Sequence, residues 1–298
     1  MISTLCLSGG GTKCISFISV LIYLENENFF KIKDIKKFVG TSGGAILGFL
    51  LSLKYKLEEL KEFVLKFDFT KFEPEVDCDN FLNNYGIDNG NKIISAISTF
   101  LFEKYKLKDI TFLELYQLTN IELNIIVTNY TKSIAENLCF KNNPNMSVIL
   151  AVRMSISIPI IFTPVLYNGN YYVDGALTSN FPLEYCLPKE TFGLVIITNQ
   201  DNELSGFIKY IRGISNVLMR TISLSNFNKS LLAEYKFIEL SPKLDSAVDF
   251  SIKKDIIEKL LNDGTEDAKQ YLSNFIANKV AKELIDDIIN NVLKNIKK

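Results

Sequence analysis

Short apolar runs alternate with helical patterns along the first two thirds of the chain. A short apolar run bounded by turn residues indicates a buried strand, and apolar residues recurring every three or four positions indicate a helix. This alternation predicts an α/β architecture in which helices cover a sheet. The predicted strands are residues 4–7, 36–39, 123–129, 135–140, 194–198 and 236–240, and the predicted helices are residues 14–24, 45–53, 57–67, 91–105 and 147–155.

Three further segments complete the pattern. The acidic stretch at residues 73–84 is expected to form an exposed loop, and the Asn-Gly pair within residues 167–171 predicts a hairpin turn. From residue 207 onward the pattern is mostly helical. The last helix, at residues 276–296, is amphipathic with terminal lysines. Such a helix either packs over the domain or lies on a membrane surface.

No internal repeat, low-complexity tract or flexible linker divides the chain. The sequence therefore predicts one compact domain. Its core is expected at residues 4–187, and residues 188–298 are expected to form a strand-and-helix extension packed on the same domain.

Composition narrows the class of protein. The 33 basic and 34 acidic residues leave a net charge of −1, which argues against a nucleic-acid partner because such proteins carry a basic footprint. Five scattered cysteines favour a reducing compartment over a disulfide scaffold or a zinc site. The N-terminus does not resemble a signal peptide, and no apolar stretch is long enough to span a bilayer. We expect a cytoplasmic protein, soluble or peripheral on membranes.

The chain contains no histidine. This excludes a Ser-His-Asp triad, a Cys-His nucleophile pair and a histidine-ligated metal. Any hydrolytic mechanism must therefore use a carboxylate or a lysine as its base.

The segment from Gly40 to Gly44 matches the pattern G-x-S-x-G, with Ser42 at its centre. An apolar strand precedes Ser42 and an apolar helix follows it, as a nucleophile elbow requires. Small residues suit a strained turn at which flanking backbones approach closely. Ser42 would lie at a helix N-terminus, where N–H groups and the helix dipole favour negative charge. The alternative is a strand-to-helix turn without chemistry, and this motif alone does not separate the two.

Three consecutive glycines, Gly9, Gly10 and Gly11, lie between the first strand and the first helix. Their N–H groups can point at an anion, either a phosphate or a tetrahedral oxyanion. The spacing is not that of a Walker A loop, and Cys14 replaces the third glycine of a dinucleotide fingerprint. Lys13 is a candidate for attracting a lipid phosphate, although a lone lysine is more often simply solvated.

Asp174 is the candidate base. It follows a run of two tyrosines and a valine and precedes Gly175 and Ala176, so it is expected at the end of a strand, in a tight turn. An aspartate in this position can accept a serine proton if it reaches hydrogen-bonding distance. Most Asp-Gly pairs only form an Asx-turn, and this segment alone favours that simpler interpretation.

In combination and in this order, the glycine loop, the G-x-S-x-G segment and the Asp-Gly-Ala segment resemble the motifs of the patatin-like phospholipases, serine acyl hydrolases with a Ser-Asp dyad. The proline-containing segment at residues 155–164 and the segment from Asn180 to Pro182 are similar to two further family patterns. The resemblance extends over residues 4–187. It implies a three-layer α/β/α sandwich with a mostly helical C-terminal portion. One departure is Cys14, where the family loop usually has glycine.

The resemblance implies that Ser42 attacks a fatty-acyl ester while Asp174 takes its proton, with an acyl-enzyme intermediate. The oxyanion is expected to be held by the N–H groups of Gly9, Gly10 and Gly11, with help from the helix after Ser42; Gly40, Gly44, Gly175 and Ala176 are the supporting motif residues. A lipid substrate is implied, with glycerophospholipid as first choice, together with peripheral membrane contact. No metal or other cofactor is expected, and no segment matches an EF-hand. Residues 156–162 either line an acyl channel or lie in the core.

Two other functions remain open on the sequence. A catalytically silent domain of the same family, binding a lipid or a partner, is suggested by Cys14. A nucleotide- or phosphate-binding module is suggested by the glycine loop, but the chain lacks the ribose and Mg²⁺ signatures of such modules.

Overall fold

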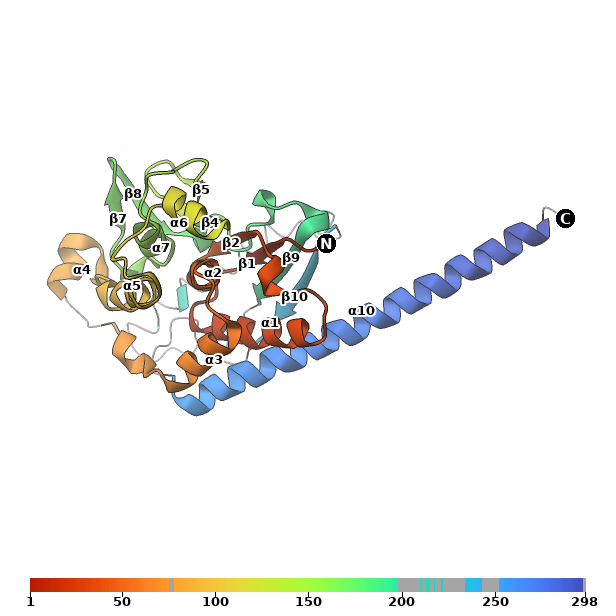
Figure 1. Cartoon of the computed structure of the whole chain (residues 1–298). Helices are drawn as coiled ribbons and strands as arrows, with labels where there is room; N and C mark the ends of the chain where they lie inside the picture. Colours follow the sequence, from red (N-terminus) through yellow and green to blue (C-terminus); the bar gives the residue numbers. More distant parts are fainter. Residues whose placement is uncertain are drawn as a thin grey trace.

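The computed structural model describes residues 1–74, 78–197, 234–242 and 252–296, together with residues 210, 213, 214, 217 and 221. At its centre lies a mixed sheet of eight strands in the order β10-β9-β1-β2-β4-β8-β7, with β5 paired to β4 (Figure 1). Strands β3 and β6 form a separate pair. The strands are β1 (Thr4–Leu7), β2 (Lys37–Thr41), β3 (Gly86–Asp88), β4 (Glu122–Asn129), β5 (Ile134–Leu138), β6 (Ile160–Phe162), β7 (Val165–Tyr167), β8 (Asn170–Asp174), β9 (Thr191–Ile196) and β10 (Lys236–Leu240).

Helices connect these strands. The α-helices are α1 (Ser16–Asn26), α2 (Gly43–Ser52), α3 (Leu57–Lys66), α4 (Cys78–Asn84), α5 (Asn91–Tyr105), α6 (Phe112–Thr119), α7 (Val148–Ser155) and α10 (Lys254–Ile296). Short 3-10 helices include η1 (Gly11–Ile15), η3 (Phe69–Phe72), η4 (Gly175–Leu177) and η5 (Leu183–Tyr185). Local capping defines several ends. At α7, the Ser147 hydroxyl accepts the N–H of Leu150 at 3.0 Å, which satisfies one of the unpaired donors at a helix start.

Alternate residues of the central strands face two separate apolar layers. Leu5 and Leu7 of β1 belong to the larger core, which is covered by α1, α2, α7 and the first part of α10. Cys6 of the same strand belongs to a smaller cluster that includes Leu183 of η5 and Tyr235. The sheet thus has helical elements on both faces. This confirms the predicted α/β/α arrangement.

Most predicted elements are confirmed with shifts of a few residues at their ends. The helix predicted at residues 14–24 begins as η1 and continues as α1, and the strand predicted at residues 194–198 is β9. The hairpin is confirmed, since Tyr167 pairs with Asn170. The mostly helical pattern predicted from residue 207 onward is confirmed at residues 254–296, which form α10, whereas most of residues 207–233 lie outside the described residues.

The prediction of an exposed loop at residues 73–84 is wrong, because Cys78–Asn84 forms α4. Phe81 packs against the main core, and the Asn80 side-chain amide donates to the Gly86 carbonyl of β3 at 2.6 Å. A single partly buried phenylalanine produces no helical periodicity in the sequence, so only these tertiary contacts reveal the helix.

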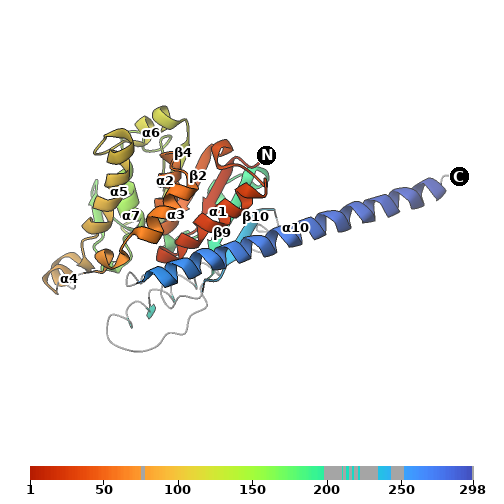
Figure 2. The same ribbon diagram turned by 60° about the horizontal axis from the view of Figure 1, so that its bottom comes forward.

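Helix α10 is 43 residues long. Its first part packs along α1 and also contacts α3 and β10, and the backbone of Ser16 approaches Gly264 so closely that a Cβ there would lie 2.5 Å from the Ser16 oxygen. Its C-terminal half extends away from the rest of the described chain (Figures 1 and 2). Strands β9 and β10, which precede this helix, pair into the central sheet, and the first part of α10 lies against the same domain. Within the described residues, no helix is both long enough and apolar enough to cross a membrane.

The strand registers determine where the functional segments meet. Leu7 of β1 pairs with Gly40 of β2, so the segments that follow these two parallel strands are neighbours. Thr41 pairs with Ile126 of β4, and the next residue of β4, Val127, pairs with Asp174 of antiparallel β8. The glycine loop, Ser42 and Asp174 are thereby brought to one region beside β4.

Candidate active site

Ser42 forms a sharp turn between β2 and α2. Its backbone has φ 52° and ψ −121°, a conformation that costs a non-glycine residue roughly 1–3 kcal/mol and that persists only where the surroundings impose it. The Ser42 N–H donates to the Ser155 hydroxyl at 2.9 Å, and the Ser42 carbonyl accepts the N–H of Ala45 at 2.9 Å. This is the geometry of a nucleophile elbow.

Close backbone contacts explain the small residues around this turn. A Cβ at Gly44 would collide with the carbonyl oxygens of Leu7 and Ser8, and a Cβ at Gly40 would lie 2.6 Å from the Gly44 oxygen. Glycine at position 44 therefore allows α2 to begin directly against the end of β1. As a result, Ser42 and the glycine loop become neighbours.

Ser42 and Asp174 form a direct hydrogen-bonded pair. The Ser42 hydroxyl donates to Oδ2 of Asp174 at 2.7 Å, and the Asp174 side chain is fully buried. The other carboxylate oxygen accepts the Ala176 N–H at 2.9 Å. Glycine is required at position 175, because a Cβ there would collide with the Ile126 carbonyl of β4. The Asp-Gly-Ala segment thus combines the Asx-turn of the simpler interpretation with a carboxylate aimed at Ser42.

The protonation equilibrium of this pair suits a base at neutral pH. Burial raises the pKa of the Asp174 carboxyl to about 7, although the hydrogen bonds from Ser42 and Ala176 lower it in part. A general base works best when its pKa lies near the operating pH. The carboxylate is therefore a stronger proton acceptor than an exposed aspartate.

The glycine loop offers fewer free donors than the sequence predicts. The Gly9 N–H donates to the Asn180 carbonyl at 3.1 Å, so it is not available as an oxyanion donor in this conformation. Within the part of the chain that the structure describes, the N–H groups of Gly10, Gly11 and Gly43 donate no hydrogen bond. A Cβ at Gly43 would lie 2.7 Å from the Gly11 oxygen, so the loop and the start of α2 are in contact. These three N–H groups are the candidate oxyanion donors.

Lys13 does not face the site. Its side chain is fully buried in η1, and it is absent from the residues that line the cavity beside Ser42. The expected contact with a substrate phosphate is inconsistent with this position.

Cys14 packs between the glycine loop and α2. A Cβ at Gly43 would lie 2.9 Å from its sulfur and a Cβ at Gly10 would lie 3.2 Å away, so the two glycines make room for the thiol. Burial, together with the negative charge of Asp174, raises the pKa of the Cys14 thiol. A thiol that stays protonated at neutral pH is a poor nucleophile. The side chain leaves the hydrogen bond between Ser42 and Asp174 intact.

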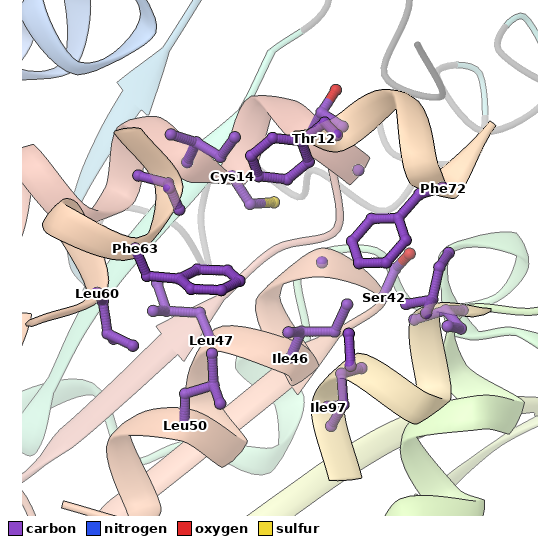
Figure 3. A pocket seen from close by; sticks show the side chains of 18 of the residues that line it. Thr12, Cys14, Ser42, Ile46, Leu47, Leu50, Leu60, Phe63, Phe72 and Ile97 are labelled. Carbon is purple, nitrogen blue, oxygen red and sulfur yellow. The ribbon is translucent and has the colours of Figure 1, made fainter. Parts of the chain in front are cut away.

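An apolar cavity of about 170 Å³ opens beside Ser42 (Figure 3). Helices α2, α3 and α5 each contribute side chains spaced three or four residues apart, which places one face of each helix on the cavity. Phe72 of η3 lines the same cavity as Ser42. Among the described residues, no charged side chain lines the cavity. The labelled lining residues in Figure 3 are Thr12, Cys14, Ser42, Ile46, Leu47, Leu50, Leu60, Phe63, Phe72 and Ile97.

The segment at residues 156–162 lies partly at this cavity and partly in the core. Ile156, Ile158 and Phe162 line the cavity, whereas Ile161 is fully buried outside it. Sequence reasoning did not single out Ser155, whose hydroxyl contacts the Ser42 N–H. The signal was present, because Ser155 lies in the proline-containing segment that resembles the family pattern. The described residues include no group of three or more acidic or cysteine side chains placed to hold a metal ion.

Comparison with known proteins assigns the chain to a family. Residues 5–187 match the family model of the patatin-like phospholipases. Because this match covers more than half of the chain, the protein belongs to the patatin-like phospholipase family.

Relatives of this chain include two viral proteins. It is 31% identical over 186 residues to a probable lipid hydrolase, 463L, of Invertebrate iridescent virus 6; this match covers 62% of the chain and 63% of the relative, less than two thirds of its length. It is 26% identical over 296 residues to the uncharacterized protein R571 of Acanthamoeba polyphaga mimivirus, covering 91% of the chain and 94% of that protein. Among solved structures, VipD from Legionella pneumophila has a TM-score of 0.60 at 17% identity, covering 92% of this chain and 67% of VipD. The similarity to VipD shows the fold alone.

Proposed function

We propose that the protein is a lipid acyl hydrolase that cleaves fatty-acyl esters with Ser42 as nucleophile and Asp174 as base. The single observation that carries this proposal is the 2.7 Å hydrogen bond from the Ser42 hydroxyl to a fully buried Asp174 carboxylate. Ser42 lines an apolar cavity. Membership of the patatin-like family supports the same reaction class.

The reaction proceeds in two halves. Asp174 takes the Ser42 proton as the serine oxygen attacks the ester carbonyl carbon. The tetrahedral intermediate then collapses, the ester C–O bond breaks, and the alcohol leaves with the proton from Asp174. In the second half, Asp174 takes a proton from water, which attacks the acyl-serine and releases the fatty acid. The proton returns to Ser42.

Backbone N–H groups stabilise the negative charge of each tetrahedral intermediate by hydrogen bonding. Gly10, Gly11 and Gly43 supply N–H groups from the loop and from the start of α2. Loss of one donor of this kind typically costs about 10²- to 10³-fold in turnover. The dipole of α2 acts in the same direction, since Ser42 precedes its first residue.

The cavity favours an aliphatic acyl chain. It extends along α2 past Ile46 and Leu50, successive turns of the helix beyond Ser42. Each methylene group transferred from water to such a site gains about 0.8 kcal/mol. Glycerophospholipid remains the first choice of substrate on the family resemblance, without support from Lys13. A phospholipid in a bilayer also requires peripheral contact of the protein with the membrane surface.

The test is fatty-acid release from phospholipid vesicles and from a soluble acyl ester, measured in EDTA because the mechanism uses no metal. Wild type is compared with Ser42→Ala and Asp174→Asn, and Ser52→Ala serves as a control that removes another buried hydroxyl, one that bonds only to Phe49 within α2. We expect activity in wild type and the control, and a loss of at least about 10³-fold in both dyad variants. Hydrolysis that persists in Ser42→Ala contradicts the proposal.

A further inference from the structure

The end of α7 contacts both members of the dyad. Ser155 is the last residue of this helix and is fully buried. Its hydroxyl accepts the Ser42 N–H at 2.9 Å and donates to the Ile126 carbonyl of β4 at 2.7 Å. Two residues later, the Ser157 carbonyl accepts the N–H of Asp174 at 2.9 Å. One short segment is therefore bonded to the backbone of the nucleophile and to that of its base.

This segment is itself anchored by a buried arginine. Arg153 is 8% exposed and donates from Nη1 to the Ser157 hydroxyl at 2.5 Å. Its other nitrogens donate to the Asn89 carbonyl, at 3.1 and 2.8 Å, and Nη2 also donates to the Thr163 carbonyl at 2.9 Å. These bonds tie α7 to the loops that flank β3 and β6. The planar guanidinium suits a site that must be contacted from several directions at once.

Side chains in this segment serve two different surroundings of Ser42, the apolar cavity and the buried hydrogen bonds. Ile156 and Ile158 line the cavity, while Ser155 and Ser157 make the buried hydrogen bonds. A displacement of the segment would therefore disturb the dyad and the cavity wall together.

We propose that Ser155 is a positioning residue that holds Ser42 in its strained conformation and thereby aims the hydroxyl at Asp174. Without the Ser155 hydroxyl, no described side chain satisfies the Ser42 N–H, and the turn is free to relax from φ 52°. The bond also occupies the Ser42 N–H, so the oxyanion donors are Gly10, Gly11 and Gly43. This inference rests on the proposed function, because it assigns a role within the same site.

The experiment compares Ser155→Ala, Ser155→Thr and the control Ser52→Ala, which removes an equally buried hydroxyl of α2. Three quantities are measured: kcat and KM on a soluble acyl ester, the rate at which a fluorophosphonate labels Ser42, and the midpoint of urea unfolding. We expect Ser155→Ala to lower kcat and the labelling rate about 10- to 100-fold, because small misplacements of reacting groups have effects of this size. KM should change little, and Ser155→Thr should restore most of the rate because it keeps the hydroxyl.

A Ser155→Ala variant that matches the control in kcat and labelling rate overturns this inference while leaving the proposed function standing. A wild type that is inert to both ester and fluorophosphonate overturns the proposed function and this inference with it. If Ser155→Ala does not fold, Ser155→Cys replaces it, since its thiol is a weaker donor and acceptor. An intermediate rate is then expected, and a wild-type rate overturns the inference.

Discussion

Ser42 lies between two regions of different chemistry. On one side, hydrogen bonds of 2.7 to 2.9 Å connect its hydroxyl and its N–H to Asp174 and Ser155. On the other side, the faces of α2, α3 and α5 line a cavity at which the described part of the chain places no charged side chain. The first region is held by directional hydrogen bonds between buried polar groups, and the second by non-directional contact between apolar side chains.

This difference predicts how substitutions in each region should affect the reaction. A hydrogen bond weakens steeply with misalignment, and a buried group left unpaired costs about 1–3 kcal/mol. Hydrophobic transfer is instead roughly proportional to the apolar area removed from water. Small changes on the dyad side should therefore abolish the reaction, whereas changes on the cavity side should shift its substrate preference by degrees.

The largest effect outside the dyad substitutions themselves is expected from pH. Asp174 must be ionised to accept the Ser42 proton, and burial raises its pKa to about 7. Activity should therefore be lost as the pH falls through about 7, with kcat/KM dropping roughly tenfold per pH unit below that value. The measurement is a profile of kcat/KM on a soluble ester, with unfolding followed at each pH. Activity that rises on acidification would exclude an Asp174 base.

A smaller, graded effect is expected from Leu50→Phe. Leu50 lines the cavity two turns along α2 from Ser42, and a larger side chain there shortens the space for an acyl chain. Each methylene that no longer fits should lower kcat/KM about fourfold, the equivalent of about 0.8 kcal/mol. Short esters should be cleaved nearly as fast as by wild type. The measured quantity is the ratio of kcat/KM for long and short acyl esters.

Leu51→Phe is the control for this prediction. Leu51 is a buried neighbour on the same helix that does not line the cavity. An equal change of the long-to-short ratio in both variants would show that crowding of α2, and not the end of the cavity, determines chain length.

The smallest effect is expected from Cys14→Gly, at the point where the two regions meet. The thiol packs against Gly10 and Gly43, and the hydrogen bond between Ser42 and Asp174 forms in its presence. Activity should change by less than about threefold. Unfolding free energy should fall by roughly 0.5–1 kcal/mol, because glycine gains conformational freedom in the unfolded chain. A large gain in activity would instead support the hypothesis that Cys14 silences the domain.

Several parts of the fold follow from local pattern. Strand β1 matches the prediction at residues 4–7, and α5 matches at residues 91–105. Each segment is predictable from its own residues: β1 is a short apolar run followed by glycines, and α5 has a long helical periodicity. Ser42 and Asp174 were also identifiable, because the tight turns around them demand small neighbours that leave a trace in the sequence.

Other features depend on distant contacts and left no such trace. Gly9 looks like its neighbours in the loop, but its N–H is taken by the Asn180 carbonyl. Lys13 looks solvated, yet it is buried in η1, which α10 contacts. Helix α4 depends on the packing of the partly buried Phe81 against the core and on the hydrogen bond from Asn80 to β3.

The sequence by itself determined the residue types of the site: a serine in a glycine-rich turn, an aspartate before glycine and the absence of histidine. Only the tertiary structure decided that Ser42 and Asp174 lie within a hydrogen bond of each other on either side of β4. Only it showed that the Ser155 hydroxyl accepts the Ser42 N–H and that faces of three helices line one cavity. The physical reason is that turn chemistry acts between adjacent residues, whereas strand register and burial are set by the packing of segments far apart in the chain.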